Sequence, residues 1–224
     1  MIDEFAKEYL HDELRWIREA MLWKLDGLSE YDVRRPLTAT GTNLLGLVKH
    51  LSYSGARYLG EVFDRPFPDT VPRWNDEAAW RDETWAAEHE TREEIIGLYR
   101  RVCEHADATI AALPIDAPGH VPWWPRPDVK LFNVMIHILN ETTRHAGHAD
   151  ILREQLDGVV GVHPESATTP SEQDRAARDT RWARIEQAAV RVSGLAVVGK
   201  NADSRSGHGR PDGGVDIDVV EAGW

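Results

Sequence analysis

Apolar residues recur every three or four positions through four long segments of the chain, while the alternation typical of strands is scarce. The four segments span about residues 3–28, 42–63, 91–113 and 130–156. Glycine or proline lies at or just beyond the end of three of them, at Gly27, Pro114 and Gly158, and these residues end helices. Four amphipathic helices joined by one long and two moderate connections predict an all-α four-helix bundle.

Two connections between these helices carry unusual compositions. The first contains a Trp-rich acidic stretch at 74–85, which we expect to form a loop with short helical turns and the wall of a pocket. The second, at 118–127, has four prolines and predicts a further loop.

The chain changes character after the fourth helix. Residues 164–179 are polar and predict a loop, and residues 181–191 predict one short helix that uses Trp182 and Ile185. Beyond this point Gly, Ser and Asp dominate, as in disordered segments. We therefore expect a bundle over 1–165, an extension with a short helix over 166–193, and a disordered tail over 194–224.

Composition and charge narrow the class of protein. The 224 residues are 42% hydrophobic, enough for one sizeable core. The 26 basic and 38 acidic side chains give a net charge of −12, which argues against nucleic acid or an anionic membrane as a partner. The N-terminus has no signal-peptide pattern and no apolar run reaches membrane-spanning length, so we expect a cytoplasmic protein.

The single cysteine, Cys103, excludes an intramolecular disulfide and a cysteine-based zinc site. It lies within an amphipathic helical pattern, where a free thiol is usually a small core residue.

The fourth helix carries an unusual set of possible metal ligands. At roughly 100° per residue, His137, Glu141, His145 and His148 fall within an arc of about 80°. This arc overlaps the edge of the apolar stripe, so the four side chains face the bundle interior. A divalent cation would stabilise a buried carboxylate and imidazoles together. The alternative is a wet helix edge, where these side chains meet water or Arg144.

A metal site in a bundle also needs a ligand from another helix, and His50 is the best-placed candidate. It is the histidine that combines a mid-helix position with the edge of an apolar face. We expect the remaining six histidines, near helix ends, on polar faces or in loops, to be solvated: His11, His89, His105, His120, His163 and His208.

Three segments resemble one known superfamily: Thr42-Asn-Leu-Leu-Gly-Leu-Val-Lys-His50, Tyr99-Arg100, and the run from Glu141 to Glu154 that contains His145-Ala-Gly-His148. Together they resemble the DinB-like superfamily of four-helix-bundle metalloproteins, and most of all an actinobacterial branch of uncharacterised domains. The superfamily includes mycothiol-dependent maleylpyruvate isomerase and related thiol S-transferases. The resemblance covers about residues 5–190 and implies an up-down-down-up bundle.

The resemblance also implies a set of metal ligands. Many members bind the metal through three histidines, the last two in a His-x-x-x-His-x-Gly arrangement. Here Glu141 takes the first of those places, as in the mycothiol-dependent isomerase, and His145 takes the second. His50 matches the first ligand, so the implied set is His50, Glu141 and His145. His137 and His148 match no ligand of the family, which leaves them supporting or catalytic roles.

Three protein ligands leave a coordination position open, which is typical of catalytic metal sites. Zinc is the expected ion, and nickel, iron or manganese suit the same donors. Our leading hypothesis is an enzyme that uses this metal to activate a low-molecular-weight thiol, mycothiol or a similar one, for S-transfer to a small electrophile or for its isomerisation. Arg144 and Arg57 would bind an anionic group and Tyr58 would donate a hydrogen bond, with surface ion pairs and core packing as their alternative roles.

Two other hypotheses stay open. One is a metal-dependent hydrolase that uses bound water, with His148 or His137 as general base. The other is a non-catalytic metal-binding or stress-related protein, in the form of a homodimer.

Overall fold

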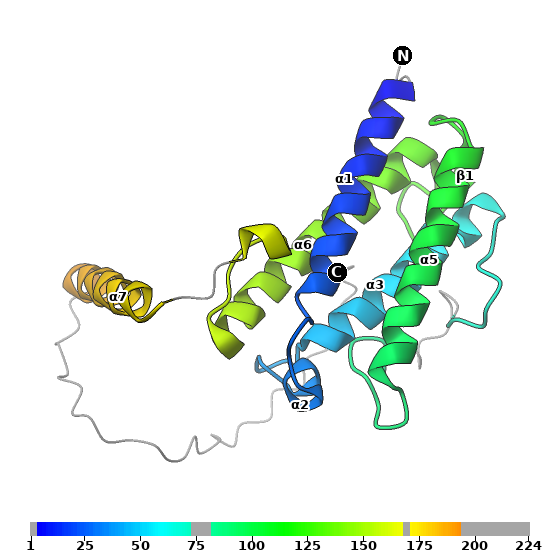
Figure 1. Ribbon diagram of the computed structural model, residues 1–224. Helices are drawn as coiled ribbons and strands as arrows, with labels where there is room; N and C mark the ends of the chain where they lie inside the picture. The colour runs from blue at the N-terminus through cyan, green and yellow to red at the C-terminus, as the bar shows by residue number, and fades with distance from the viewer. Residues whose placement is uncertain (1–3, 73–81, 168–170, 194–224) are drawn as a thin grey trace. The chain divides into compact units, whose positions relative to one another are not determined.

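The computed structural model describes residues 4–72, 82–167 and 171–193 (Figure 1). The chain divides into two compact units, Met1–Thr169 and Pro170–Trp224, and each is described by itself. In the described parts of both units, no helix is long and apolar enough to cross a membrane.

Four long helices form the first unit: α1 (Glu4–Trp23), α3 (Leu44–Tyr58), α5 (Arg92–Ala112) and α6 (Leu131–Asp157). Side chains cap two of them. The Asn43 side chain accepts a hydrogen bond from the Gly46 amide at 2.8 Å, and Thr91 and Glu94 form a reciprocal capping box. Gly158, with φ 76°, adopts the left-handed conformation that ends α6. The four helices predicted from the apolar periodicity are therefore confirmed.

The helices pack in an up-down-down-up order (Figure 1). Near the end of α6, Arg153 donates a hydrogen bond to the carbonyl of Lys24, just past the end of α1, so these two helices run parallel. Lys49, early in α3, binds Glu90, just before α5, and these helices also run parallel. Since α3 lies antiparallel to α6, as contacts in the site show, the predicted all-α bundle and its topology are confirmed.

The core lies between these four helices. Its fully buried members include Leu14 on α1, Leu45 and Val48 on α3, Ile110 on α5 and Leu131 on α6. Burying each such side chain contributes about 1.5–3 kcal/mol, so the apolar stripes stabilise the bundle.

Shorter elements differ from the sequence prediction. A short helix not predicted from the sequence, α2 (Glu30–Arg34), follows α1 and is capped by Ser29. The second predicted helix ends at Tyr58 rather than 63 and is followed by the 3₁₀ helix η1 (Glu61–Phe63). A second 3₁₀ helix, η2 (Pro164–Ser166), follows α6. These short elements depend on local hydrogen bonds, which apolar periodicity does not report.

The proline-rich loop after α5 contains a small antiparallel hairpin. Strand β1 (Pro118–His120) pairs with β2 (Asp128–Lys130), and Gly119 lies opposite Val129. A Cβ on Gly119 would lie 2.7 Å from the Phe63 ring, so glycine allows the hairpin to approach η1 closely.

The second unit is described as one helix, α7 (Glu172–Ser193). The prediction of a loop up to 179 and a short helix over 181–191 is therefore wrong in length. Ser171 and Asp174 exchange hydrogen bonds that cap the helix start, and the residues that follow are strong helix formers such as Ala, Arg and Glu. Such a polar helix needs no apolar stripe. The predicted tail at 194–224, and residues 73–81 of the Trp-rich stretch, lie outside the described residues.

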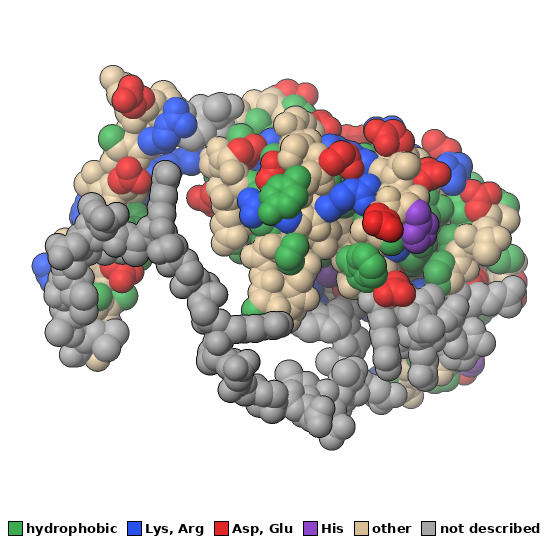
Figure 2. Space-filling view, turned by 90° about the horizontal axis from the view of Figure 1, so that it is seen from below, with side chains coloured by type: hydrophobic (Ala, Val, Ile, Leu, Met, Phe, Trp, Pro, Cys, Tyr) green, Lys and Arg blue, Asp and Glu red, His purple; other side chains and the backbone are tan. Residues whose placement is uncertain are grey.

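Figure 2 shows one face of the molecule, where acidic and basic side chains are interspersed with apolar ones. The excess of acidic residues is therefore not segregated on this face, and the oppositely charged neighbours screen one another.

Candidate metal centre

His50 on α3 and Glu141 and His145 on α6 meet in the bundle interior. One possible ligand atom from each residue lies within 4.8 Å of the others. The Nε2 atoms of both histidines lie 3.1 Å from the same oxygen, Oε1 of Glu141, and the two rings are 4.9 Å apart. Glu141 and His145 are buried, at 5% and 6% exposed, and His50 is half-buried. The set predicted from sequence and resemblance thus converges on one point.

Helix geometry brings these side chains together. Glu141 and His145 are one turn apart on the same face of α6. On the opposing helix, His50 lies level with Glu141, and Tyr58, two turns later, lies level with His137, one turn earlier on α6. The two stripes therefore face each other along antiparallel helices.

The protonation of the cluster without metal follows from its contacts. Burial alone would raise the pKa of Glu141, but the hydrogen bonds from His145 and His50 lower it well below its usual value. Burial alone would lower the pKa of His50, but its hydrogen bonds to Glu141 and Glu83 raise it to about 9. At neutral pH a proton on His50 therefore takes the place that a cation could fill.

The donor set fits a divalent cation. Two imidazole nitrogens and one carboxylate oxygen are the ligands of many catalytic zinc sites, and they also suit other transition metals. Among the described residues, Nδ1 of His145 is buried and has no hydrogen-bond partner. A buried polar atom without a partner is costly and is common at functional sites, so it is consistent with a functional centre here.

Glu83 is a part of the site that sequence reasoning missed. Its Oε1 lies 2.8 Å from Nδ1 of His50, and its Oε2 accepts a hydrogen bond from Arg57 at 2.9 Å. Burial raises the pKa of Glu83, but the bond to His50 and the charge of Arg57 outweigh this, and the pKa is lowered. Glu83 belongs to the Trp-rich acidic stretch, in which nothing distinguishes it from neighbouring acidic residues.

The predicted substrate-binding residue Arg57 is 6% exposed. Its guanidinium binds Glu83 and the carbonyl of Pro72. The guanidinium of Arg57 therefore binds protein groups next to the Glu83 side of His50. Arg144, in contrast, is exposed on α6.

Aromatic residues pack around His137, one turn before Glu141 on α6. The hydroxyl of Tyr58 accepts hydrogen bonds from the indoles of Trp123 and Trp124, at 3.0 and 3.1 Å. The ring of His137 lies 4.5 Å from that of Tyr58, and burial lowers the pKa of His137. Both tryptophans come from the β1–β2 loop, whose contact with α3 is not apparent from the composition of the loop.

His148 lies one turn beyond His145 at the edge of the cluster. It is half-buried, and its ring lies 5.4 Å from that of His145. Burial and then the charge of neighbouring His145 lower the pKa of His148. At neutral pH it is a free base that can accept a proton.

Two histidines expected to be solvated take part in internal contacts. His11 is 9% exposed and lies 2.8 Å from a carboxylate oxygen of Asp107, which also binds Arg18 at 2.8 Å. His105 lies 2.7 Å from the carbonyl of Arg65. The polar face of α1 that holds His11 is covered by α5, which a single helix pattern does not reveal.

The fold and the cluster define the class: an all-α four-helix bundle with a candidate metal site between two of its helices. A family model described as mycothiol S-transferase matches residues 9–158, about two thirds of the chain, and the chain belongs to this family. A comparison with curated protein sequences finds no match. Family membership confirms the resemblance to DinB-like proteins.

Proposed function

We propose that this protein is a metal-dependent enzyme that activates mycothiol, or a similar low-molecular-weight thiol, for S-transfer to a small electrophile or for its isomerisation. The observation that carries the proposal is the convergence on one point of His50, Glu141 and His145, from two helices, with Glu141 and His145 buried and His50 half-buried. The mycothiol S-transferase family supports the choice of thiol.

The proposed ligands leave room for a reactant. A divalent cation with three protein ligands keeps a position open and lowers the pKa of a thiol bound there, which favours the nucleophilic thiolate. Zinc is our first choice because it holds this donor set without redox chemistry, with nickel, iron and manganese as the alternatives.

The thiol has to come from outside the chain. Burial raises the pKa of Cys103, so this thiol stays protonated at neutral pH, and a thiol rather than a thiolate is a weak nucleophile. Cys103 also packs against the bundle core.

Two histidines can take the proton that the substrate thiol loses. The pKa of His148 and that of His137 are both lowered, so each is neutral and able to accept. His148 is the better placed because it adjoins His145 at the edge of the cluster. In S-transfer, the sulfur lone pair would form the S–C bond while the bond from that carbon to its leaving group breaks and the leaving group takes its electron pair. In isomerisation, the thiolate would add to the C=C bond, the resulting single bond would rotate, and elimination of the thiolate would restore the double bond.

Three further residues complete the proposed site. The exposed Arg144 would bind an anionic group of the thiol or substrate, and the buried Arg57 would act through Glu83. Tyr58, already the acceptor of two indole bonds, keeps its own hydroxyl proton to donate to a substrate.

The surroundings of the protein are also part of the proposal. A low-molecular-weight thiol stays reduced in the cytoplasm, where we place the enzyme. Its partners are small molecules rather than nucleic acid or membrane, and light scattering would test for a homodimer.

The first experiment measures bound metal in protein purified without a His-tag, for the wild type and for His50→Ala, Glu141→Ala and His145→Ala. Asp107→Asn is the matched control, because it removes a carboxylate that binds a histidine and an arginine elsewhere. We expect near-stoichiometric metal in the wild type and control and its loss in the other three.

The second experiment measures turnover of mycothiol with alkyl halides, epoxides and unsaturated acids. Turnover that needs both thiol and metal supports the proposal. Hydrolysis without thiol would favour the hydrolase, and bound metal with no turnover of any electrophile would favour the non-catalytic protein. An absence of metal even after reconstitution would refute the proposed site.

A further inference from the structure

The side of His50 that faces away from Glu141 also has a carboxylate partner, Glu83. We propose that Glu83 is a positioning residue, which holds the His50 imidazole in the tautomer and orientation that a metal ligand needs, with Arg57 keeping Glu83 in place. This inference rests on the proposed metal site.

The geometry around the ring supports this role. Glu83 Oε1 lies 2.8 Å from Nδ1, while Glu141 Oε1 lies 3.1 Å from Nε2. The two ring nitrogens point in different directions, so the two carboxylates lie on different sides of the imidazole. A carboxylate only accepts hydrogen bonds, so Nδ1, beside Glu83, keeps its proton whether or not metal is bound. When a cation replaces the proton on Nε2, that atom would give its lone pair to the cation beside Glu141.

Arg57 completes the support. Its Nη2 donates to the second oxygen of Glu83 at 2.9 Å, and the two side chains are 6% and 7% exposed. A buried carboxylate without a cationic partner would be strongly unfavourable, so the pair is stable only as a unit. The Nε atom of Arg57 also binds the carbonyl of Pro72, which limits its movement.

The backbone that carries Glu83 is fixed to the same helix as His50. Lys49 Nζ donates to the carbonyls of Asp82 and Trp85, on either side of Glu83, at 2.9 and 3.0 Å. One turn earlier, a Cβ on Gly46 would lie 1.9 Å from the Thr84 carbonyl oxygen, so the turn rests directly on the backbone of α3.

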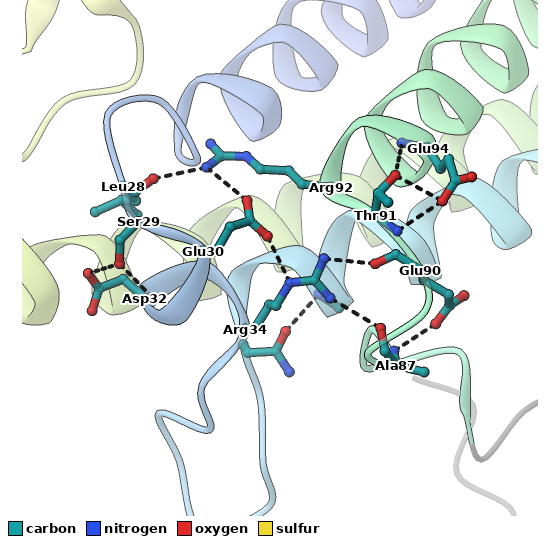
Figure 3. A network of polar contacts seen from close by, with 12 residues as sticks. Leu28, Ser29, Glu30, Asp32, Arg34, Ala87, Glu90, Thr91, Arg92 and Glu94 are labelled. Carbon is teal, nitrogen blue, oxygen red and sulfur yellow. Dashed lines mark hydrogen bonds and ion pairs between the residues drawn. The ribbon is translucent and has the colours of Figure 1, made fainter.

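The residues that follow this turn, 86–90, also form hydrogen bonds to α2 and α3. Figure 3 shows Arg34 on α2 reaching the carbonyls of Ala87 and Glu90, with hydrogen bonds of 3.3 and 2.7 Å. Glu90 in turn binds Lys49. Residues 82–90 are therefore tied to α2 and α3 at several points, as a support for a ligand requires.

The test compares Glu83→Gln with Asp107→Asn, a matched control whose carboxylate also joins a histidine to an arginine but lies outside the cluster. The measurement is the Zn²⁺ dissociation constant, from competition with a chromophoric chelator at fixed pH. We expect Glu83→Gln to weaken zinc binding about 10- to 100-fold, since partners behind a metal-binding histidine have effects of this size. The control should leave zinc binding unchanged, although both variants lower thermal stability.

Equal zinc affinity in Glu83→Gln and the wild type would overturn the inference while leaving the metal site standing. A wild type that binds no zinc would overturn both. A merely structural role predicts that Glu83→Gln and the control lose stability alike and bind zinc alike.

A second measurement uses only the wild type. Nitrogen-15 NMR of the zinc-loaded protein, with the His50 ring assigned by through-bond correlation to its own backbone, reports which ring nitrogen carries the proton. We expect protonated Nδ1 and metal-bound Nε2. Metal on Nδ1 would refute the role of Glu83.

Discussion

The protonation of His50 predicts how metal binding depends on pH. Without metal, His50 lies between Glu83 and Glu141 and its pKa is about 9, so a cation entering the cluster has to displace a proton. The apparent association constant should therefore rise about tenfold for each pH unit between 7 and 8.5. At pH 7 the proton costs two pKa units, or about 3 kcal/mol of binding free energy.

The stability of the metal-free protein should change in the opposite direction. The pKa of His50 is raised from 6.5 to about 9 on folding, so its contribution is fully present below pH 6.5 and is lost as the pH rises through 9. The shift of about 2.5 units corresponds to roughly 3 kcal/mol. Raising the pH from 6.5 to 9 should thus lower the stability of the metal-free protein while it raises the affinity for metal.

Two assays measure these effects. Chelator competition gives the zinc affinity at each pH, corrected for the protonation of the chelator. Calorimetry in two buffers of different ionisation enthalpy counts the protons released, and we expect about one at pH 7.5. A zinc affinity that is flat from pH 7 to 8.5, with no proton released, would refute the proposed protonation of His50.

Three further predictions follow from the packing around the site. Gly46→Ala should lower the free energy of unfolding by about 1–3 kcal/mol and weaken zinc binding, because the new Cβ would displace the Thr84 carbonyl and the turn that carries Glu83. Gly147→Ala has open space around its Cβ and should instead raise the free energy of unfolding by up to about 1 kcal/mol. Urea unfolding measures both changes. Cys103→Ala should keep thiol-dependent turnover, measured with mycothiol, since the buried thiol takes no part; loss of turnover in the folded variant would contradict this. Tyr58→Phe should cost about 1–3 kcal/mol in urea unfolding, because the indoles of Trp123 and Trp124 lose their acceptor, and an unchanged midpoint would show that water replaces it.

The parts of this molecule that follow from local pattern were predictable from the sequence. The four long helices have apolar residues every three or four positions, which predicts a helix. Glu141 and His145 share a face of α6 because they are one turn apart. The length of α7 was missed, since a polar helix lacks that period.

Contacts between segments that are far apart in the sequence were harder to predict. His50 could be chosen by its position on a core edge, but Glu83 lies in a loop and meets His50 only after α3 and the 82–90 segment have packed. His11 likewise looked solvated until α5 covered it. Such partners depend on tertiary packing, which neither helical spacing nor composition encodes directly.

The charges around His50 give a reason why the proposed metal centre would prefer an anionic reactant. The charges of Glu83, Arg57, Glu141 and protonated His50 sum to zero, which lowers the cost of burying these groups. When a divalent cation replaces the proton, and His145 joins as a neutral ligand, the sum becomes +1. Binding of one anion restores neutrality, and a thiol that gives up its proton is such an anion. The second carboxylate behind His50 therefore limits the excess positive charge to one unit, the amount that a single thiolate neutralises.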